Sequence, residues 1–425
     1  MRALLILSVV VLSFFLLKWW SPGTSEAAPL EPIPESEPAQ ARFLAPPPSA
    51  QSPVTETTAT SPSPEPVQQE QERRSDWPEP EAGGEQSELA AAAALVHGTP
   101  ADVQVASAGL APDRARLVEA FAWMLAGERQ LAVSLSTKIS KDEVPGREGA
   151  LFEAALTGKA AEPASSMEGP LARAMEMALL SREAGESLRA GEPAEAARQY
   201  SRLLVGELEA PWTADPGVLA AWTLGLDEAQ RHHRWDPRGE WPGVEMEVQP
   251  GDSMITVRKR FLADHPGAVL CTGLIERAND VKGFLQPGQK LRVPTDTARI
   301  LVDLEARWAL FFLGDEVAGS WPVGIGRPGE ETPPGDYVAK DKIENPPWMK
   351  VGQEAIPFGD PRNPLGTRWI GWSRDGQKTS YGFHGTQAPE SIGKAESDGC
   401  VRFRNDDIEE LFQILPEGAA IRVQG

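Results

Sequence analysis

Cysteine is scarce in this chain: its 425 residues contain only Cys271 and Cys400. Exported domains that rely on disulfides carry many cysteines in even sets, so a disulfide framework is excluded. The five histidines are scattered without metal-ligand spacing, and we predict no metal site and no cofactor. Basic residues are also few, 41 against 62 acidic ones, and the net charge of -21 argues against nucleic acid as a partner.

Long apolar runs are almost absent, and the exception lies at the N-terminus. The run from Ala3 to Leu17 has the length of a secretory hydrophobic region and is slightly short for a membrane span. Lys18 and the two tryptophans after it suit a membrane interface, whereas Ser25-Glu26-Ala27 offers a weak cleavage site. Residues 1–20 are therefore a signal peptide or a membrane anchor, with the anchor favoured, and both predict a location in the cell envelope, periplasmic or extracytoplasmic.

Composition divides the next part of the chain in two. Residues 21–86 are rich in proline, glutamate and serine, as in "EPIPESEPAQ", and such a stretch buries too little apolar surface to fold. We expect a disordered linker there. Residues 87–240 are rich in Ala, Leu and Glu with helical periodicity, for example Leu117, Phe121, Met124 and Leu125 on one face, and predict an all-α domain.

Two glycines in this helical part stand at similar positions. Gly158 and Gly191 follow similar helical stretches 33 residues apart, close to the period of tetratricopeptide repeats. The similarity covers at most two units. A repeat array and an irregular helical bundle both stay open.

Residues 244–295 carry two turn motifs, "VQPGDSM" and "LQPGQKLRVP", at the borders of alternating apolar residues. The stretch resembles the LysM module, a small α/β strand-helix-helix-strand unit that binds the N-acetylglucosamine glycans of peptidoglycan or chitin. The resemblance implies that Gly251, Asp252 and Asn279 contribute to a glycan site. A turn-rich linker domain without glycan affinity is the alternative, and Cys271 is interpreted as a core residue.

After Pro294 the sequence changes to short β-rich segments separated by glycine and proline, which predicts a mainly-β domain over residues 299–425. One helix interrupts it near the C-terminus, because Ile408, Leu411, Phe412 and Leu415 recur at helical spacing. The predicted fold is therefore multidomain: an N-terminal anchor or signal, a disordered linker, a helical domain, a small α/β module and a mainly-β domain with one C-terminal helix.

This last domain resembles the L,D-transpeptidase catalytic domain, also called YkuD-like. The resemblance rests on "TPPGDY", "NPLGTRWIGW" and "GFHGTQAPESIGKAESDGCVRF" in that order. Members of the family are cell-wall enzymes whose cysteine attacks the tetrapeptide stem of peptidoglycan, releases D-alanine and transfers the acyl group to an amine. The expected partners are thus glycan strands and stem peptides of peptidoglycan, and the membrane if the N-terminus is not cleaved.

The resemblance also assigns roles to individual residues. Cys400 is the nucleophile and His384, 16 residues upstream, is the general base and acid. Arg402 would lower the thiol pKa or bind a substrate carboxylate, and Gly399 would let main-chain N–H groups approach the acyl oxygen. These residue types suit amide attack, because a cysteine gains thiolate character from a nearby imidazole and positive charge.

Asp398 departs from the family pattern, which usually has Ser-His-Gly-Cys where this chain has Ser-Asp-Gly-Cys. An unpaired carboxylate there would raise the thiol pKa, whereas pairing with Arg402 or His384 would orient the site. The paired arrangement, and hence an active enzyme, is the favoured hypothesis. The alternatives are a non-catalytic peptidoglycan-binding protein with a decayed site, and an enzyme that hydrolyses the stem or attaches it to a protein amine.

Overall fold

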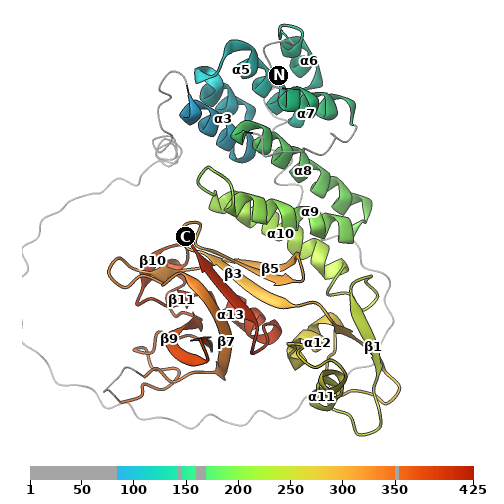
Figure 1. Cartoon of the computed structure of the whole chain (residues 1–425), viewed down its shortest axis with the longest axis vertical. Coiled ribbons are helices and arrows are strands. Elements are labelled where there is room, and N and C mark those ends of the chain that lie inside the picture. Colours follow the sequence, from blue (N-terminus) through green and yellow to red (C-terminus); the bar gives the residue numbers. More distant parts are fainter. Residues whose placement is uncertain (1–83, 141–145, 159–168, 350–353) are drawn as a thin grey trace, which may run out of the picture. The chain divides into compact units, whose positions relative to one another are not determined.

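The structure is a computed structural model that describes residues 84–140, 146–158, 169–349 and 354–425 (Figure 1). The predicted signal or anchor and nearly all of the predicted linker lie outside these residues. Within them, no helix is both long and apolar enough to cross a membrane.

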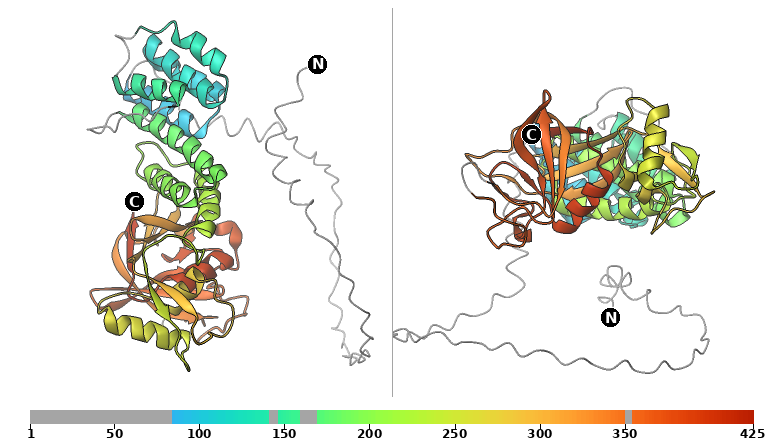
Figure 2. Two further views of the ribbon diagram at one scale, coloured as in Figure 1. Left: turned by 90° about the vertical axis from the view of Figure 1, so that its right-hand side faces the viewer. Right: turned by 90° about the horizontal axis from the view of Figure 1, so that it is seen from below.

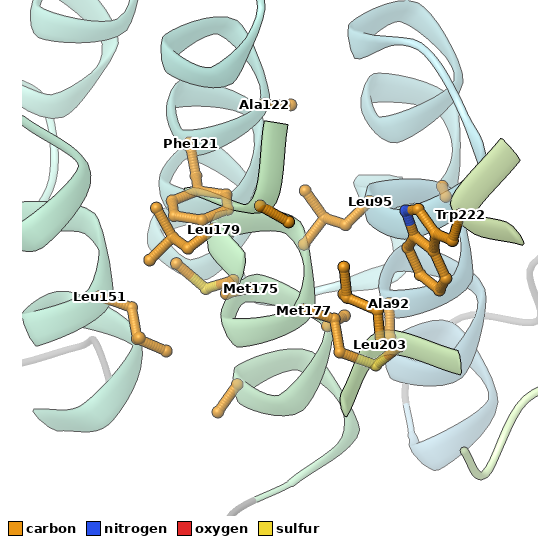
Figure 3. Close-up of a cluster of buried hydrophobic side chains, with 14 of the residues drawn as sticks. Ala92, Leu95, Phe121, Ala122, Leu151, Met175, Met177, Leu179, Leu203 and Trp222 are labelled. Atoms are coloured by element: carbon orange, nitrogen blue, oxygen red, sulfur yellow. The ribbon is translucent and has the colours of Figure 1, made fainter. Parts of the chain in front are cut away.

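Helices fill the first described part, as predicted. They are α3 (Glu85–His97), α4 (Pro100–Ala106), α5 (Pro112–Leu125), α6 (Arg129–Ser136), α7 (Gly146–Thr157), α8 (Pro170–Ala190), α9 (Pro193–Leu208) and α10 (Pro216–His232). The predicted apolar face of α5 is confirmed: Leu117, Phe121 and Met124 are buried. Figure 3 shows Phe121 beside Met175 and Leu179 of α8 in the same apolar cluster.

The two glycines singled out in the sequence both end helices. Gly158 follows α7 with φ 69° and Gly191 follows α8 with φ 77°, a left-handed conformation that glycine adopts without steric cost. After Gly191 the chain starts α9 at Pro193, but the residues after Gly158 lie outside the described part. The repeat period therefore stays a prediction.

A small unit follows, with the predicted order of strand, two helices and strand: β1 (Gly243–Glu247), α11 (Met254–Asp264), α12 (Thr272–Ala278) and β2 (Lys290–Pro294). The strands pair antiparallel, with Gly243 opposite Pro294. Ser253 begins α11 with a capping box to Thr256, and Val248, Val257 and Leu291 form a small apolar core. We call this unit the 243–294 module.

The C-terminal domain is built on an eight-stranded sheet in the order β11-β9-β8-β7-β12-β3-β4-β5. Its strands are β3 (Ala298–Asp303), β4 (Trp308–Leu313), β5 (Glu316–Pro322), β7 (Gly335–Glu344), β8 (Arg368–Arg374), β9 (Gln377–His384), β11 (Val401–Arg402) and β12 (Ala420–Gln424), and β6 (Ile325–Gly326) pairs separately with β10 (Ala395–Ser397). The sheet curls strongly (Figures 1 and 2), and Gly324, two residues beyond β5, forms a bridge with Arg402 of β11 at the other end. The curl therefore brings the two ends of the sheet together.

The predicted C-terminal helix is α13 (Asn405–Ile414), which covers one face of the sheet. Its buried residues include Ile408 and Leu411, as the spacing predicted. The Lys342 ammonium caps its C-terminal end by donating hydrogen bonds to the carbonyl groups of Phe412 and Leu415.

Strand β4 is apolar along its whole length because both of its faces are covered. Ala309, Phe311 and Leu313 join the core of the sheet domain, whereas the alternate residues Trp308, Leu310 and Phe312 pack into the cluster formed by the helices. The helical part is thus packed directly on the sheet.

Polar contacts reinforce this junction at the neighbouring strand β5. Ser201 of α9 accepts a hydrogen bond from the N–H of Val317 at 2.7 Å, and Gln230 of α10 donates to the carbonyl of the same residue at 2.7 Å. Arg234 adds ion pairs to Asp296 and Glu316. This contact was not predicted from the sequence.

Candidate active site

Cys400, His384 and Arg402 are brought together by the parallel pairing of β9 and β11. His384 is the last residue of β9 and lies opposite Arg402 in the register, and Cys400 directly precedes β11. Alternation along a strand places Cys400 and Arg402 on the face opposite the buried Val401. The structure therefore brings together the three residues that the sequence singled out.

The His384 imidazole is buried and held by its own backbone. Its Nδ1 lies 2.5 Å from the carbonyl oxygen of Gly385, and because a carbonyl only accepts, Nδ1 carries the proton and Nε2 keeps a free lone pair. Trp369 of β8 stacks on the ring, with a centroid distance of 6.1 Å. Burial lowers the pKa of His384 to about 4, with a smaller lowering from Arg402 and an opposing effect from the Gly385 carbonyl. The imidazole is therefore neutral at pH 7 and able to accept a proton.

The Cys400 thiol is protonated at rest. Protein atoms around it raise its pKa to about 11, and this desolvation outweighs the lowering by a backbone hydrogen bond from Gly382 and by the charge of Arg402. The sulfur makes a long contact of 3.8 Å to the carbonyl of Ser380 and no hydrogen bond to His384. Arg402 does lower the thiol pKa, as the sequence suggested, but desolvation of the sulfur outweighs this effect and the net shift is upward.

Asp398 pairs with a residue that the sequence did not suggest. Its carboxylate forms an ion pair with Arg327, which follows β6, and not with Arg402 or His384. The predicted partner was wrong because proximity in sequence does not decide proximity in space: β10 and β6 lie side by side. Arg402 keeps a buried Nε without a hydrogen-bond partner, and it forms no ion pair within the described residues.

Gly399 has a conformation and a position that both require glycine. Its φ is 101°, and a Cβ atom would lie 2.8 Å from the ring of Tyr381. Its N–H donates to the hydroxyl of Ser397 at 3.2 Å, and that hydroxyl donates to the carbonyl of Cys400 at 2.6 Å. Gly399 thus shapes the loop, while its own N–H is already engaged.

Several residues that shape the site were not identified from the sequence. Trp369 lies over Gly371 and Gly382, where a Cβ would approach its indole within 3.1 and 2.7 Å. Asn405 of α13 accepts a hydrogen bond from the N–H of Thr367 and donates to the carbonyl of Thr386, which ties the loop after His384 to the helix. The glycines in "GTRWIG" and "GFHGT" were the available signal, because each marks a close approach of another group.

The residues expected to bind glycan lie in the 243–294 module and are engaged in local contacts. Gly251 has φ 87°, and Asp252 accepts hydrogen bonds from the Gln249 N–H and Thr256 and pairs with Arg260. Asn279 donates to the carbonyls of Ile275 and Arg292 and accepts from the Arg292 N–H, each at 2.8 Å. Asn279 therefore stabilises the fold of the module, and its part in glycan binding stays a prediction.

Two hollows of the described surface do not include the Cys400 site. One of about 500 Å³ lies between α12, α13 and β7, where Cys271 donates a hydrogen bond to the Gln413 carbonyl at 3.2 Å. The other, of about 490 Å³, lies beside Trp369 and the β7–β8 pairing. The chemistry of the side chains, rather than cavity size, marks Cys400 as the site. Both cysteines are free, and no cluster of three potential metal ligands occurs in the described part of the chain.

Comparisons with known proteins identify the family of the C-terminal domain. The family model of the L,D-transpeptidase catalytic domain matches residues 297–423. Protein YqjB of Bacillus subtilis, named as an L,D-transpeptidase, is 37% identical over 125 residues, which cover 29% of this chain and 69% of that protein. Protein YkuD of Bacillus licheniformis, named likewise, is 30% identical over 185 residues, 42% of this chain and 96% of that protein. The chain therefore belongs to the L,D-transpeptidase family and is an enzyme of that class.

Two further similarities are weaker. Protein ErfK/SrfK of Salmonella typhimurium, also named as an L,D-transpeptidase, is 33% identical over 175 residues, 36% of this chain and 55% of that protein. The solved catalytic domain of the E. faecium L,D-transpeptidase, acylated by ertapenem, is 23% identical and covers 30% of this chain and 97% of that one, with a TM-score of 0.25. At that TM-score the structural similarity adds nothing to the assignment.

Proposed function

We propose that this protein is an exported enzyme that uses Cys400 to acylate itself on the tetrapeptide stems of peptidoglycan and then transfers the acyl group to an amine. The observation that carries the proposal is the register of β9 and β11, which sets Arg402 opposite His384, with Cys400 directly before β11. The apolar run from Ala3 to Leu17 supports export to the cell envelope.

The reaction begins from a neutral thiol and a neutral imidazole. The thiol leaves the Ser380 carbonyl and turns toward Nε2 of His384, which accepts its proton as the sulfur attacks the scissile carbonyl. The imidazolium then donates this proton to the leaving amine of D-alanine, and the C–N bond breaks to leave a thioester on Cys400. An acceptor amine attacks the thioester in the second half, with His384 taking and returning a proton in the same way.

Two further groups serve the acyl and carboxylate parts of the substrate. The N–H of Cys400 makes no hydrogen bond in the described structure and is available for the developing oxyanion, whereas the N–H of Gly399 is taken by Ser397. The guanidinium of Arg402, which forms no ion pair within the described residues, can bind the terminal carboxylate of the stem. Its charge also favours the thiolate as the proton leaves.

A glycan-binding role of the 243–294 module completes the proposal. A module that holds the glycan raises the local concentration of stem peptides at Cys400. The loop after α12 exposes 96% of Phe284, a side chain on which a sugar ring could stack. Phe284→Ala in the full chain should reduce co-sedimentation with insoluble peptidoglycan and leave turnover of soluble muropeptides unchanged. Leu224→Ala, which alters a side chain that is 72% exposed on α10, is the matched control.

The raised thiol pKa favours one rival, a peptidoglycan-binding protein with a decayed site. Incubation of the protein with disaccharide-tetrapeptides and mass spectrometry of the products separates the candidates. Cross-linked dimers support transpeptidation, and tripeptides without dimers point to hydrolysis. Unchanged tetrapeptides, together with unmodified protein, would favour the decayed site.

A further inference from the structure

Arg327 and Asp398 flank the nucleophile from two different loops. Arg327 follows β6 and Asp398 follows β10, and these two strands pair in parallel with Ser397 opposite Gly326. The two side chains form an ion pair, and the N–H of Arg327 also donates to the carbonyl of Ser397 at 2.9 Å. The loop after β6 is therefore joined to the nucleophile loop through both backbone and side chain.

The segment held in this way is very short. Between the end of β10 at Ser397 and the start of β11 at Val401 lie only Asp398, Gly399 and Cys400. Gly399 has no side chain with which to be held, and Cys400 must leave its own side chain free to react. The side chain of Asp398 is thus the only one of the three that can hold the loop from outside.

The ion pair also determines the charges next to the sulfur. The carboxylate of Asp398 opposes ionisation of the Cys400 thiol, and the guanidinium of Arg327 neutralises this charge. Arg402 therefore does not have to neutralise Asp398, and it forms no ion pair within the described residues. Both partners of the ion pair are half-exposed, and exposed ion pairs contribute little to folding stability, so its place beside Cys400 is its main feature.

We propose that Arg327 is a positioning residue for catalysis, which holds Asp398 and thereby fixes the Asp398-Gly399-Cys400 loop in the geometry for attack. In the family pattern a histidine occupies the position of Asp398, so this pair is a feature of this chain. The inference rests on the proposed function, because it concerns the rate at which Cys400 is acylated. It requires Arg327 to act through Asp398 rather than through the substrate.

The test measures acyl-enzyme formation on disaccharide-tetrapeptides by rapid quench and intact-protein mass spectrometry. Arg327→Gln should lower the maximal acylation rate about 3- to 10-fold with an unchanged KM, since one unpaired neighbouring charge shifts a pKa by about one unit. Arg327→Lys should keep most of the rate, because a lysine can still pair with Asp398. Arg327→Gln/Asp398→Asn should be no slower than Arg327→Gln alone, as expected for two residues that act as one unit.

A remote ion pair provides the control. Arg422 pairs with Asp336 between β12 and β7 with similar exposure, so Arg422→Gln should leave acylation unchanged. Salt gives a second readout: raising the ionic strength should slow the wild type but not the double variant.

An acylation rate of Arg327→Gln within twofold of a functional wild type, or a loss confined to KM, would overturn the inference. A wild type that forms no acyl-enzyme would instead overturn the proposed function, so the two failures are distinguishable. Thermal unfolding followed by circular dichroism, with all variants close to the wild type, confirms that the rates compare folded proteins.

Discussion

Cys400 is predicted to be a protonated thiol at neutral pH, and the rate of its alkylation measures this directly. With a pKa of about 11, about one thiol in ten thousand is ionised at pH 7, and iodoacetamide reacts only with the thiolate. An unperturbed cysteine, with its value of 9.0, would be about a hundred times more ionised at that pH. The difference lies well within the range of a labelling experiment.

The assay follows alkylation by mass spectrometry from pH 6 to 10 in the Cys271→Ala variant, which leaves Cys400 as the only thiol. Because deprotonation precedes reaction, the rate should rise about tenfold per pH unit over this range without a plateau. Cysteine in a short peptide serves as the reference and should level off above its pKa. At pH 7, Cys400 should react about a hundred times more slowly than this reference.

Acylation by the stem peptide should behave differently, because His384 removes the proton during attack. With a pKa of about 4, His384 is competent as a base at all pH values well above 4, so acylation should be nearly flat from pH 6 to 8. A rapid alkylation rate that is independent of pH between 6 and 9 would show that the Cys400 thiol is not protonated at rest. It would indicate a preformed thiolate and imidazolium pair.

Three further predictions concern stability and the shape of the site. The folded pKa of His384 is depressed from 6.5 to about 4, so lowering the pH from 7 to about 4.5 should cost the wild type about 2.5 kcal/mol of unfolding free energy. The His384→Gln variant should lack this loss in urea titrations at the same two pH values. Gly399→Ala should lower the acylation rate at least tenfold, because backbone strain and the contact with Tyr381 add. Gly393→Ala is the control, since Gly393 has φ 82° and open space around it and the variant bears only the strain of about 1–2 kcal/mol. Equal acylation rates of the two variants would contradict a role of the Tyr381 contact. Ser201→Ala should destabilise the protein by about 1–3 kcal/mol, because the buried Val317 N–H loses its acceptor. A change below about 0.5 kcal/mol in urea unfolding, the size expected for a surface substitution, would mean that water replaces the serine hydroxyl as acceptor.

The elements of the C-terminal domain were predictable because their signals are local. Short β-rich segments with glycine or proline at nearly every gap marked the strands, and the spacing of Ile408 and Leu411 marked α13. The family motifs also assigned Cys400, His384 and Arg402 to one site; the β9–β11 register sets Arg402 opposite His384, and the roles of the three residues stay predictions. The helical cover on the second face of strand β4 was not predictable, since the sequence does not say what an apolar face packs against.

The partners and charges within the site were not predictable, because they depend on contacts between distant segments. Asp398 pairs with Arg327, 71 positions away in sequence, because β6 and β10 lie side by side. The raised thiol pKa reflects the protein atoms that the fold packs around the half-buried Cys400, a property that residue types do not reveal. The resemblance to the LysM module implied that Asn279 contributes to a glycan site, and its hydrogen bonds to the backbone became evident only in three dimensions.

Cys400 is proposed to carry the acyl group, and intact-protein mass spectrometry of the two single-cysteine variants distinguishes it from Cys271. After incubation with disaccharide-tetrapeptide, Cys271→Ala should gain the mass of the acyl group, and peptide mapping should locate it on Cys400. Cys400→Ala should gain no mass, although it should retain the fold of the wild type. Acylation of Cys400→Ala to the same extent as Cys271→Ala would contradict the account.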